Sequence, residues 1–112
     1  MKITLCGSTR FEKQYTAWNK YLTLKGHTVY SLGYWPPNPR PSEHEKTTLD
    51  LVHLSKIEES KCIFVIDCPR LAGEDQIEKP YIGESTSREI QWAYIRQKHV
   101  FYSHLEGVED AL

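Results

Sequence analysis

Five consecutive apolar residues, Cys-Ile-Phe-Val-Ile at positions 62–66, constrain the fold of this chain more than any other feature. A strand with one face in water alternates apolar and polar side chains, whereas an unbroken apolar run is typical of a strand covered on both faces. The run lies within Lys61–Asp67 and is bounded by polar residues, so we expect a buried strand there. Sheets covered on both faces are usually parallel, with helices as the connections.

Strands and helices alternate along the rest of the chain. Phe11, Tyr15 and Trp18, for example, have the spacing of one helix face. In order, the sequence predicts a strand at Lys2–Cys6, a helix at Arg10–Lys25, a strand at His27–Leu32, a proline-rich loop at Gly33–Lys46, a helix from Thr47 or Thr48 to about Ser60, the strand at Lys61–Asp67, a loop at Cys68–Ile82, a helix at Ser85–Gln97 and a strand at His99–Tyr102. This order predicts an α/β fold, a flavodoxin-like or Rossmann-like α/β/α sandwich around a small parallel sheet of about four to five strands in the order 2-1-3-4.

Size and charge exclude several classes of function. At 112 residues the chain is expected to form one domain, residues 1–112. The chain has fourteen basic and fifteen acidic residues, so strong electrostatic binding to a nucleic acid polymer is not expected. No apolar run approaches the roughly 20 residues of a membrane span. Three cysteines without CxxC spacing and five histidines without metal spacing predict a reduced, cytoplasmic protein with no metal site.

In such a sheet, ligands bind beyond the carboxyl ends of the strands, where the strand order reverses. Two loops should meet there: Cys6–Arg10, and the segment from Asp67 to Ser87. Both contain glycine and hydroxyl side chains just before a predicted helix, which is the arrangement that binds small anions.

The first loop has the residues of a small anion site. Gly7 allows a close approach of the backbone to a ligand, Ser8 and Thr9 offer hydroxyl groups, and Arg10 offers a planar guanidinium for phosphate or carboxylate. The alternative is that Ser8 or Thr9 only caps the helix and that Arg10 is solvated.

The second loop repeats this pattern with Gly83, Ser85 and Ser87. Glu89 follows in the first turn of the predicted helix, where the positive end of the helix would keep a catalytic carboxylate ionised. The alternative is structural, because Thr86 and Glu89 have the T-x-x-E spacing of a capping box.

Other polar residues also allow two interpretations. His53 could act in catalysis or simply be packed, and Asp67, at a strand end, could bind a ligand or hold a loop. Cys6 and Cys68 could be reactive thiols, although inert buried thiols are the simpler interpretation. Trp35–Pro37 could form a lid or an ordered turn.

Two motifs resemble those of a known family. The loop Cys6–Arg10, CGSTR, resembles the first loop of the nucleoside 2-deoxyribosyltransferase superfamily and is close to the Cys-Gly-Ser-x-Arg of its 2′-deoxynucleoside 5′-monophosphate N-glycosidase branch. The segment Ile82–Ala93, IGESTSREIQWA, resembles the superfamily's second motif, a Gly- or Ser-rich turn opening a helix whose first-turn Glu is the nucleophile. His53–Lys61 fits the stretch that leads into the third strand. The chain also resembles small bacterial and phage-type proteins with CGSTRF near the start and GYIGEST near the end.

The resemblance implies roles for several residues. Glu89 would be the nucleophile, and Gly7, Ser8 and Arg10 would contact the base, sugar or phosphate. Ser85 and Ser87 would also contact the substrate, although the phosphate-binding Ser of the family lies farther ahead of the Glu. In this chain Gly83 stands at that position.

Two positions depart from the family pattern. His53 stands where many members have an Asp that works with the nucleophile, and Thr4 stands where members often have a Tyr. The catalytic machinery is therefore altered, and His53 is the residue that could protonate the leaving base.

The resemblance implies cleavage or transfer of the N-glycosidic bond of a nucleoside or nucleoside 5′-monophosphate, with no metal or organic cofactor. The alternative function is a nucleotide-binding or sensing module that kept the fold and lost turnover. A homo-oligomer, dimer or larger, is expected because the family is oligomeric and because Trp18, Trp92 and Tyr94 cannot all face one small core.

Overall fold

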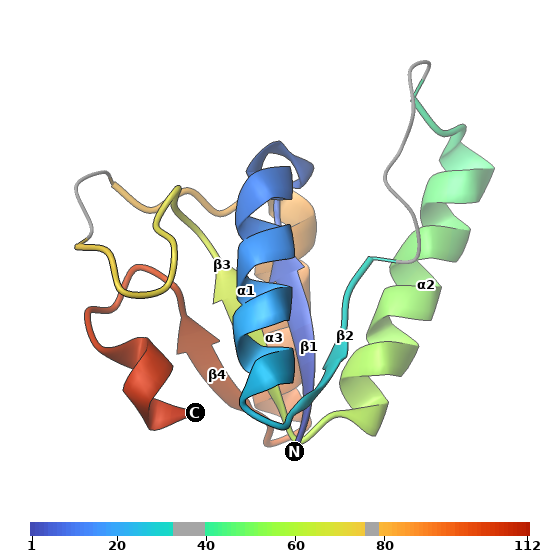
Figure 1. The fold of residues 1–112 in the computed structure, drawn as a ribbon. Helices are drawn as coiled ribbons and strands as arrows, with labels where there is room; N and C mark the ends of the chain where they lie inside the picture. Colours follow the sequence, from blue (N-terminus) through green and yellow to red (C-terminus); the bar gives the residue numbers. More distant parts are fainter. Residues whose placement is uncertain (33–39, 76–78) are drawn as a thin grey trace.

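A computed structural model describes residues 1–32, 40–75 and 79–112 and shows a parallel sheet between helices (Figure 1). The strands are β1 (Lys2–Gly7), β2 (Thr28–Tyr30), β3 (Cys62–Ile66) and β4 (His99–Tyr102), in the order β2-β1-β3-β4. The helices are α1 (Glu12–Leu24), α2 (Glu43–Glu59) and α3 (Glu84–Ile95), with short 3-10 turns η1 (Thr9–Phe11) and η2 (Val108–Ala111). The predicted fold class and strand order are confirmed.

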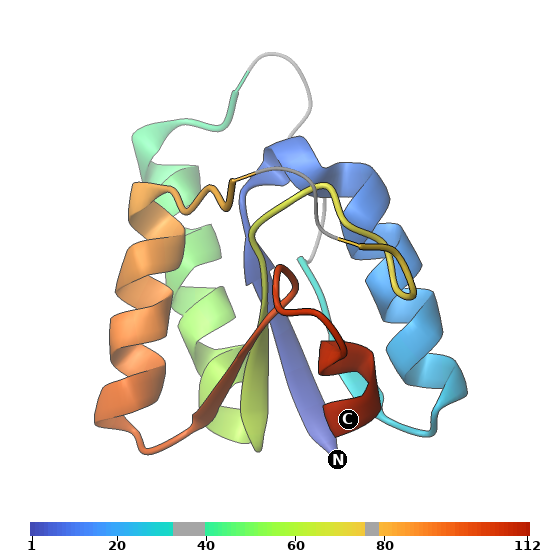
Figure 2. The ribbon, with the colours of Figure 1, turned by 90° about the vertical axis from the view of Figure 1, so that its left-hand side faces the viewer.

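Helices cover both faces of the sheet (Figure 2). On one face, Ile3 and Leu5 of β1 pack against the buried side of α1 and against Val108 of η2. On the other face, Cys6 lies in the cluster formed with α2 and α3. Because successive side chains of a strand point to opposite faces, Thr4 and Cys6 share the α2–α3 face.

The central strand confirms the starting argument. Every residue of β3 is buried, and β3 pairs with β1 on one side and β4 on the other. Five apolar side chains in a row can be buried only where both faces of the sheet are covered.

The start of α2 corrects the sequence prediction, which extended the loop to Lys46. The helix begins at Glu43 because Ser42 caps it: the Ser42 hydroxyl accepts from the Glu45 amide, and the Glu45 carboxylate accepts from the Ser42 amide. This reciprocal pair is a capping box, and its S-x-x-E spacing was present in the sequence.

Other boundaries shift by a few residues. The turn η1 precedes α1, which therefore begins at Glu12 instead of Arg10, and β2 is shorter than the predicted His27–Leu32. Trp35–Pro37, for which the sequence allowed a lid or a turn, lies outside the described residues. Among the described residues, no helix has the length and apolar character needed to cross a membrane.

Candidate active site

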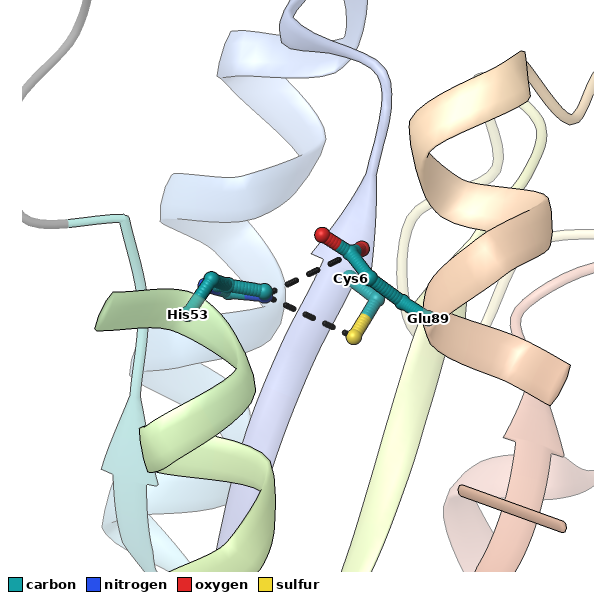
Figure 3. Close-up of side chains that lie close together, drawn as sticks. All are labelled: Cys6, His53 and Glu89. Atoms are coloured by element: carbon teal, nitrogen blue, oxygen red, sulfur yellow. Dashed lines mark hydrogen bonds and ion pairs between the residues drawn. The ribbon is translucent and has the colours of Figure 1, made fainter. Parts of the chain in front are cut away.

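Three side chains from three different elements meet on the α2–α3 face of the sheet: Cys6 of β1, His53 of α2 and Glu89 of α3 (Figure 3). The Nε2 atom of His53 lies 3.5 Å from the Sγ atom of Cys6 and 4.0 Å from Oε1 of Glu89. Cys6 is fully buried, His53 is buried, and the Glu89 side chain keeps 13% of its surface exposed. Glu89 is therefore the member of the group that a ligand reaches.

Cys6 occupies this position because of its place on β1. Thr4, two residues earlier on the same face, is held at the Ser60 end of α2, where its hydroxyl bonds the Ser60 hydroxyl and the Lys56 carbonyl. Cys6 instead lies at the carboxyl end of the strand, and its thiol hydrogen-bonds the Glu89 carboxylate. The simpler sequence interpretation, an inert packed thiol, omitted this contact with the predicted nucleophile.

The start of α3 rules out the capping-box interpretation of Glu89. Gly83 is the N-cap and makes no side-chain cap, while Thr86 lies inside the helix, two residues after its first residue. The Ser87 amide donates to the Gly83 carbonyl as an early helical bond. Glu89 consequently lies in the second turn, and the predictions of a first-turn position and of a T-x-x-E cap are wrong.

Burial controls the protonation of Glu89. Loss of solvent raises the pKa of Glu89 to about 7, the Cys6 hydrogen bond opposes this shift, and Asp50 adds to it. Lys46 and Arg88 lower the pKa by smaller amounts. The helix terminus was expected to keep the carboxylate fully ionised, but desolvation outweighs it, so both protonation states are populated near neutral pH.

His53 is neutral under the same conditions. Burial, and to a smaller extent the positive charge of Lys56, lower its pKa to about 4, although the Leu5 backbone and the Asp50 charge act in the opposite direction. The predicted role of His53 as an acid relied on the ordinary pKa of imidazole. Burial lowers that pKa well below neutral pH, so the ring has no acidic proton to give there. At neutral pH the ring therefore carries one proton and offers one lone pair.

Charged and hydroxyl groups of α2 and α3 contact one another, and the charged ones act on the pKa of Glu89. The Ser85 hydroxyl accepts from Lys46 Nζ at 3.1 Å and from Arg88 at 3.4 Å, and Lys46 pairs with Asp50 at 3.0 Å. Lys46, Asp50 and Arg88 were not predicted from the sequence as site residues. Lys46, Asp50 and His53 have the i, i+4, i+7 spacing of one helix face. The periodicity of α2 could therefore have pointed to Lys46 and Asp50.

The first loop is shaped by Gly7. Its φ is +153°, and a Cβ atom there would lie 2.5 Å from the backbone oxygen of Ile66 on β3. The Tyr15 hydroxyl, buried below the loop, donates to the Gly7 carbonyl at 2.9 Å. Cys6 and Glu89 both contribute to a raised pKa of Tyr15, behind the larger effect of burial. Tyr15, which the sequence placed only in the core, is thus a further residue near the site.

The hydroxyl groups of the first loop are partly used by the fold. The Ser8 hydroxyl accepts from the Arg10 amide, so Ser8 caps η1 as the structural alternative proposed. Thr9 is exposed. The exposed guanidinium of Arg10 stacks on the ring of Tyr81 at 3.6 Å, and the Tyr81 amide donates to the Asp67 carbonyl. The two loops therefore meet at the carboxyl end of the sheet, as the pattern predicted.

Asp67 serves the fold instead of facing the group around Glu89. It is fully buried; Oδ1 accepts from the Ser103 hydroxyl and the His104 amide, and Oδ2 contacts the His104 ring. Both carboxylate oxygens hold the turn after β4. This arrangement fits the loop-holding alternative and leaves no exposed oxygen for a ligand.

Cys6, His53 and Glu89 also form a group that could hold a metal ion, because one donor atom from each lies within 4.8 Å of the others. Sequence spacing could not reveal this group, since its members come from three distant segments. Two surface hollows of about 520 and 540 Å³ lie elsewhere, one lined by α1 and one at the Met1 edge. The site is therefore identified by its side chains, not by a cavity.

Comparison with solved structures gives two similar proteins. One is a 2-deoxyribosyltransferase from Bacillus psychrosaccharolyticus, with a TM-score of 0.69 and 23% identity, covering 91% of this chain and 71% of the other. The second is the CMP N-glycosidase BcmB from Clostridium botulinum, with a TM-score of 0.52 and 17% identity, covering 91% and 70%. Family models and curated proteins gave no match. The resemblance noted in the sequence is confirmed by a fold that this chain shares with a 2-deoxyribosyltransferase and a CMP N-glycosidase.

Proposed function

We propose that this protein cleaves or transfers the N-glycosidic bond of a nucleoside or nucleoside 5′-monophosphate, with Glu89 as the nucleophile. The observation that carries the proposal is the position of Glu89. Its carboxylate is mostly buried, lies at the switch point of the sheet and contacts Cys6 and His53. The two similar structures, named for deoxyribosyl transfer and for CMP N-glycoside cleavage, support the reaction type.

The reaction proceeds by two displacements. A carboxylate oxygen of Glu89 bonds to the anomeric carbon while the bond from that carbon to the base nitrogen breaks. The electron pair leaves with the base, which takes a proton from solvent. Water or a second base then attacks the same carbon and releases the carboxylate; water yields hydrolysis and a base yields transfer.

Burial suits Glu89 to this role. A pKa of about 7 means that the ionised form is available near neutral pH but is poorly solvated. A poorly solvated carboxylate loses little hydration when it attacks carbon. The Cys6 thiol donates a hydrogen bond to the carboxylate and favours its ionised form.

His53 acts as a positioning residue in this proposal. Its neutral ring, 4.0 Å from Glu89 and 3.5 Å from Cys6, packs beside the carboxylate without supplying a positive charge. An acid with a pKa of about 4 would hold almost no transferable proton near pH 7.

A 5′-phosphate has cationic partners at the same edge of the sheet. Arg10 offers an exposed guanidinium on the first loop, and Lys46 and Arg88 flank Ser85 at the start of α3. The backbone N–H groups that open α3 after Gly83 add donors for an anion. These groups support a nucleotide over a free nucleoside as the substrate.

The second candidate function is a nucleotide-binding or sensing module without turnover. The neutral state of His53 and the engagement of Thr4 by Ser60 and Lys56 favour it, because neither residue supplies an acid or a hydroxyl to Glu89.

Release of free base from a panel of nucleosides and nucleotides separates the two functions, with Glu89→Gln as the control. Base release that depends on Glu89 supports the enzyme. A thermal shift with nucleotides, identical in both proteins and without base release, supports the binding module and contradicts the proposed reaction.

A further inference from the structure

We propose that Cys6, His53 and Glu89 form a binding site for one divalent transition-metal ion of the Zn²⁺ class. The three donor atoms converge from β1, α2 and α3 on one point of the α2–α3 face (Figure 3). The proposed glycosidic reaction does not require this site, and metal binding can be measured without any nucleotide.

Two donor-atom separations can be compared with those around a tetrahedral ion. With Zn–S near 2.3 Å and Zn–N near 2.0–2.1 Å, tetrahedral ligands place sulfur and nitrogen about 3.5 Å apart. The Cys6 Sγ to His53 Nε2 distance is 3.5 Å. The His53 to Glu89 distance is 4.0 Å, so the carboxylate must approach by about half an ångström to meet Zn–O distances near 2.0–2.2 Å. Glu89 is the most exposed and longest of the three side chains, and it can make this adjustment.

The donor types select the class of metal. A thiolate and an imidazole favour Zn²⁺ and similar ions over Mg²⁺ and Ca²⁺, which prefer oxygen ligands. The low pKa of His53 keeps its ring neutral and able to coordinate, and the ring also hydrogen-bonds the Leu5 carbonyl. Metal-binding histidines commonly use their second nitrogen for such a bond, which fixes the orientation of the ring.

The charges of the site balance on metal binding. A Cys6 thiolate and a Glu89 carboxylate together carry two negative charges, which one divalent cation cancels. Burial opposes each anion separately and raises both pKa values, whereas a neutral metal complex avoids this cost. The Cys6 proton, and that of protonated Glu89, pass to the buffer when the ion binds.

Metal binding and glycosyl transfer use the same carboxylate. Once Glu89 coordinates the ion, its oxygen is not available to attack an anomeric carbon, and a glycosylated Glu89 cannot coordinate in the same way. Three protein ligands leave a fourth position for an exogenous ligand on the side where Glu89 is exposed. The metal-bound and the glycosylated protein therefore exclude each other.

Cobalt substitution tests the site in the full chain. The chelator-treated protein is titrated with Co²⁺ and its absorption is recorded. We expect one Co²⁺ per chain, a thiolate-to-cobalt charge-transfer band, the strong visible bands of tetrahedral Co²⁺, and loss of these bands when Zn²⁺ is added. Cys6→Ser should lose the charge-transfer band, while Cys68→Ser, which alters a buried thiol outside the group, should retain it.

His53→Asn provides a second variant if Cys6→Ser does not fold. It should weaken Co²⁺ binding by at least about tenfold, because even outer-shell partners of a metal ligand contribute that much. Absence of a charge-transfer band in the wild type, its persistence in Cys6→Ser, or unchanged affinity in His53→Asn would overturn the proposal. Base release without metal binding would leave the glycosidic reaction standing, and metal binding without base release would leave only the metal site.

Discussion

Burial sets the chemistry of Glu89 at the scale of single residues. The sequence suggested a carboxylate kept ionised by a helix terminus, but the side chain lies one turn further along α3 and mostly out of water. Desolvation therefore decides its pKa, and the charges of Asp50, Lys46 and Arg88 adjust it. This one pKa governs how both the reaction rate and the stability of the protein depend on pH.

The first prediction concerns how the rate of base release depends on pH. If Glu89 attacks as the anion, the rate of base release should rise with pH through a midpoint near 7, because the ionised fraction grows about tenfold between pH 6 and pH 8. Initial rates at constant substrate concentration measure it. Asp50→Asn should move the midpoint to lower pH, since the Asp50 charge raises the pKa of Glu89. A rate independent of pH across this interval would contradict the assignment.

The second prediction concerns how the free energy of unfolding depends on pH. The folded protein holds the Glu89 proton more tightly than the unfolded chain, whose pKa is near 4.5. The stabilisation from the protonated form is therefore complete below about pH 4.5 and is lost as pH rises through about 7. Glu89→Gln, which cannot ionise, should exceed the wild type in free energy of unfolding by up to about 3 kcal/mol near pH 8 and by less than about 1 kcal/mol near pH 5. Urea denaturation at both pH values measures this, and equal stability at the higher pH would refute it.

At the scale of elements, apolar pattern and chain order predicted most of the architecture. The run at 62–66 gave the central strand, and the alternation of elements gave the order β2-β1-β3-β4. Helix starts were harder, because several hydroxyl residues competed as caps. The N-cap of α2 is Ser42 and not Thr47, and the N-cap of α3 is Gly83 and not Thr86. Ser42 is fixed by its reciprocal bonds with Glu45, whereas Gly83 caps α3 without any side-chain bond, so cap spacing alone did not decide both helix starts.

The candidate site was predictable only in part. Glu89 and His53 were identified through the resemblance, while the contact of both with Cys6 depends on how β1, α2 and α3 pack. The pKa values depend on the same packing, since burial is their largest cause. Tertiary contacts therefore changed the expected roles of His53 and Asp67.

The turn between β1 and η1 gives an element-level prediction. Gly7→Ala places a Cβ 2.5 Å from the Ile66 oxygen and should lower the free energy of unfolding by more than about 2 kcal/mol. Gly26→Ala is the matched control, because Gly26 also has a positive φ but meets no atom within 4 Å, and it should cost about 1 kcal/mol. Chemical denaturation of both variants tests this. Equal losses would show that the close approach to β3 is unimportant.

At the scale of the whole molecule, several large apolar side chains among the described residues are exposed, and the sheet ends in the edge strands β2 and β4. Trp18 packs against Phe64 in the core, but Tyr94 and Ile95 of α3 and Leu51 of α2 are more than half exposed. The edge strands β2 and β4 are short. We predict a homo-oligomer, dimer or larger, and sedimentation velocity at micromolar concentration measures it. A single monomer-sized species would contradict this prediction.

The covalent role of Glu89 is the central claim, and intact-mass spectrometry tests it most directly. Wild-type protein and Glu89→Gln are incubated with a panel of deoxynucleotides, and protein mass and free base are measured in the same samples. The wild type should release base and, with a slow substrate, gain the mass of one glycosyl group, which peptide mapping should place on Glu89. Glu89→Gln should bind nucleotide but show neither adduct nor base. Base release that persists in Glu89→Gln would contradict the account.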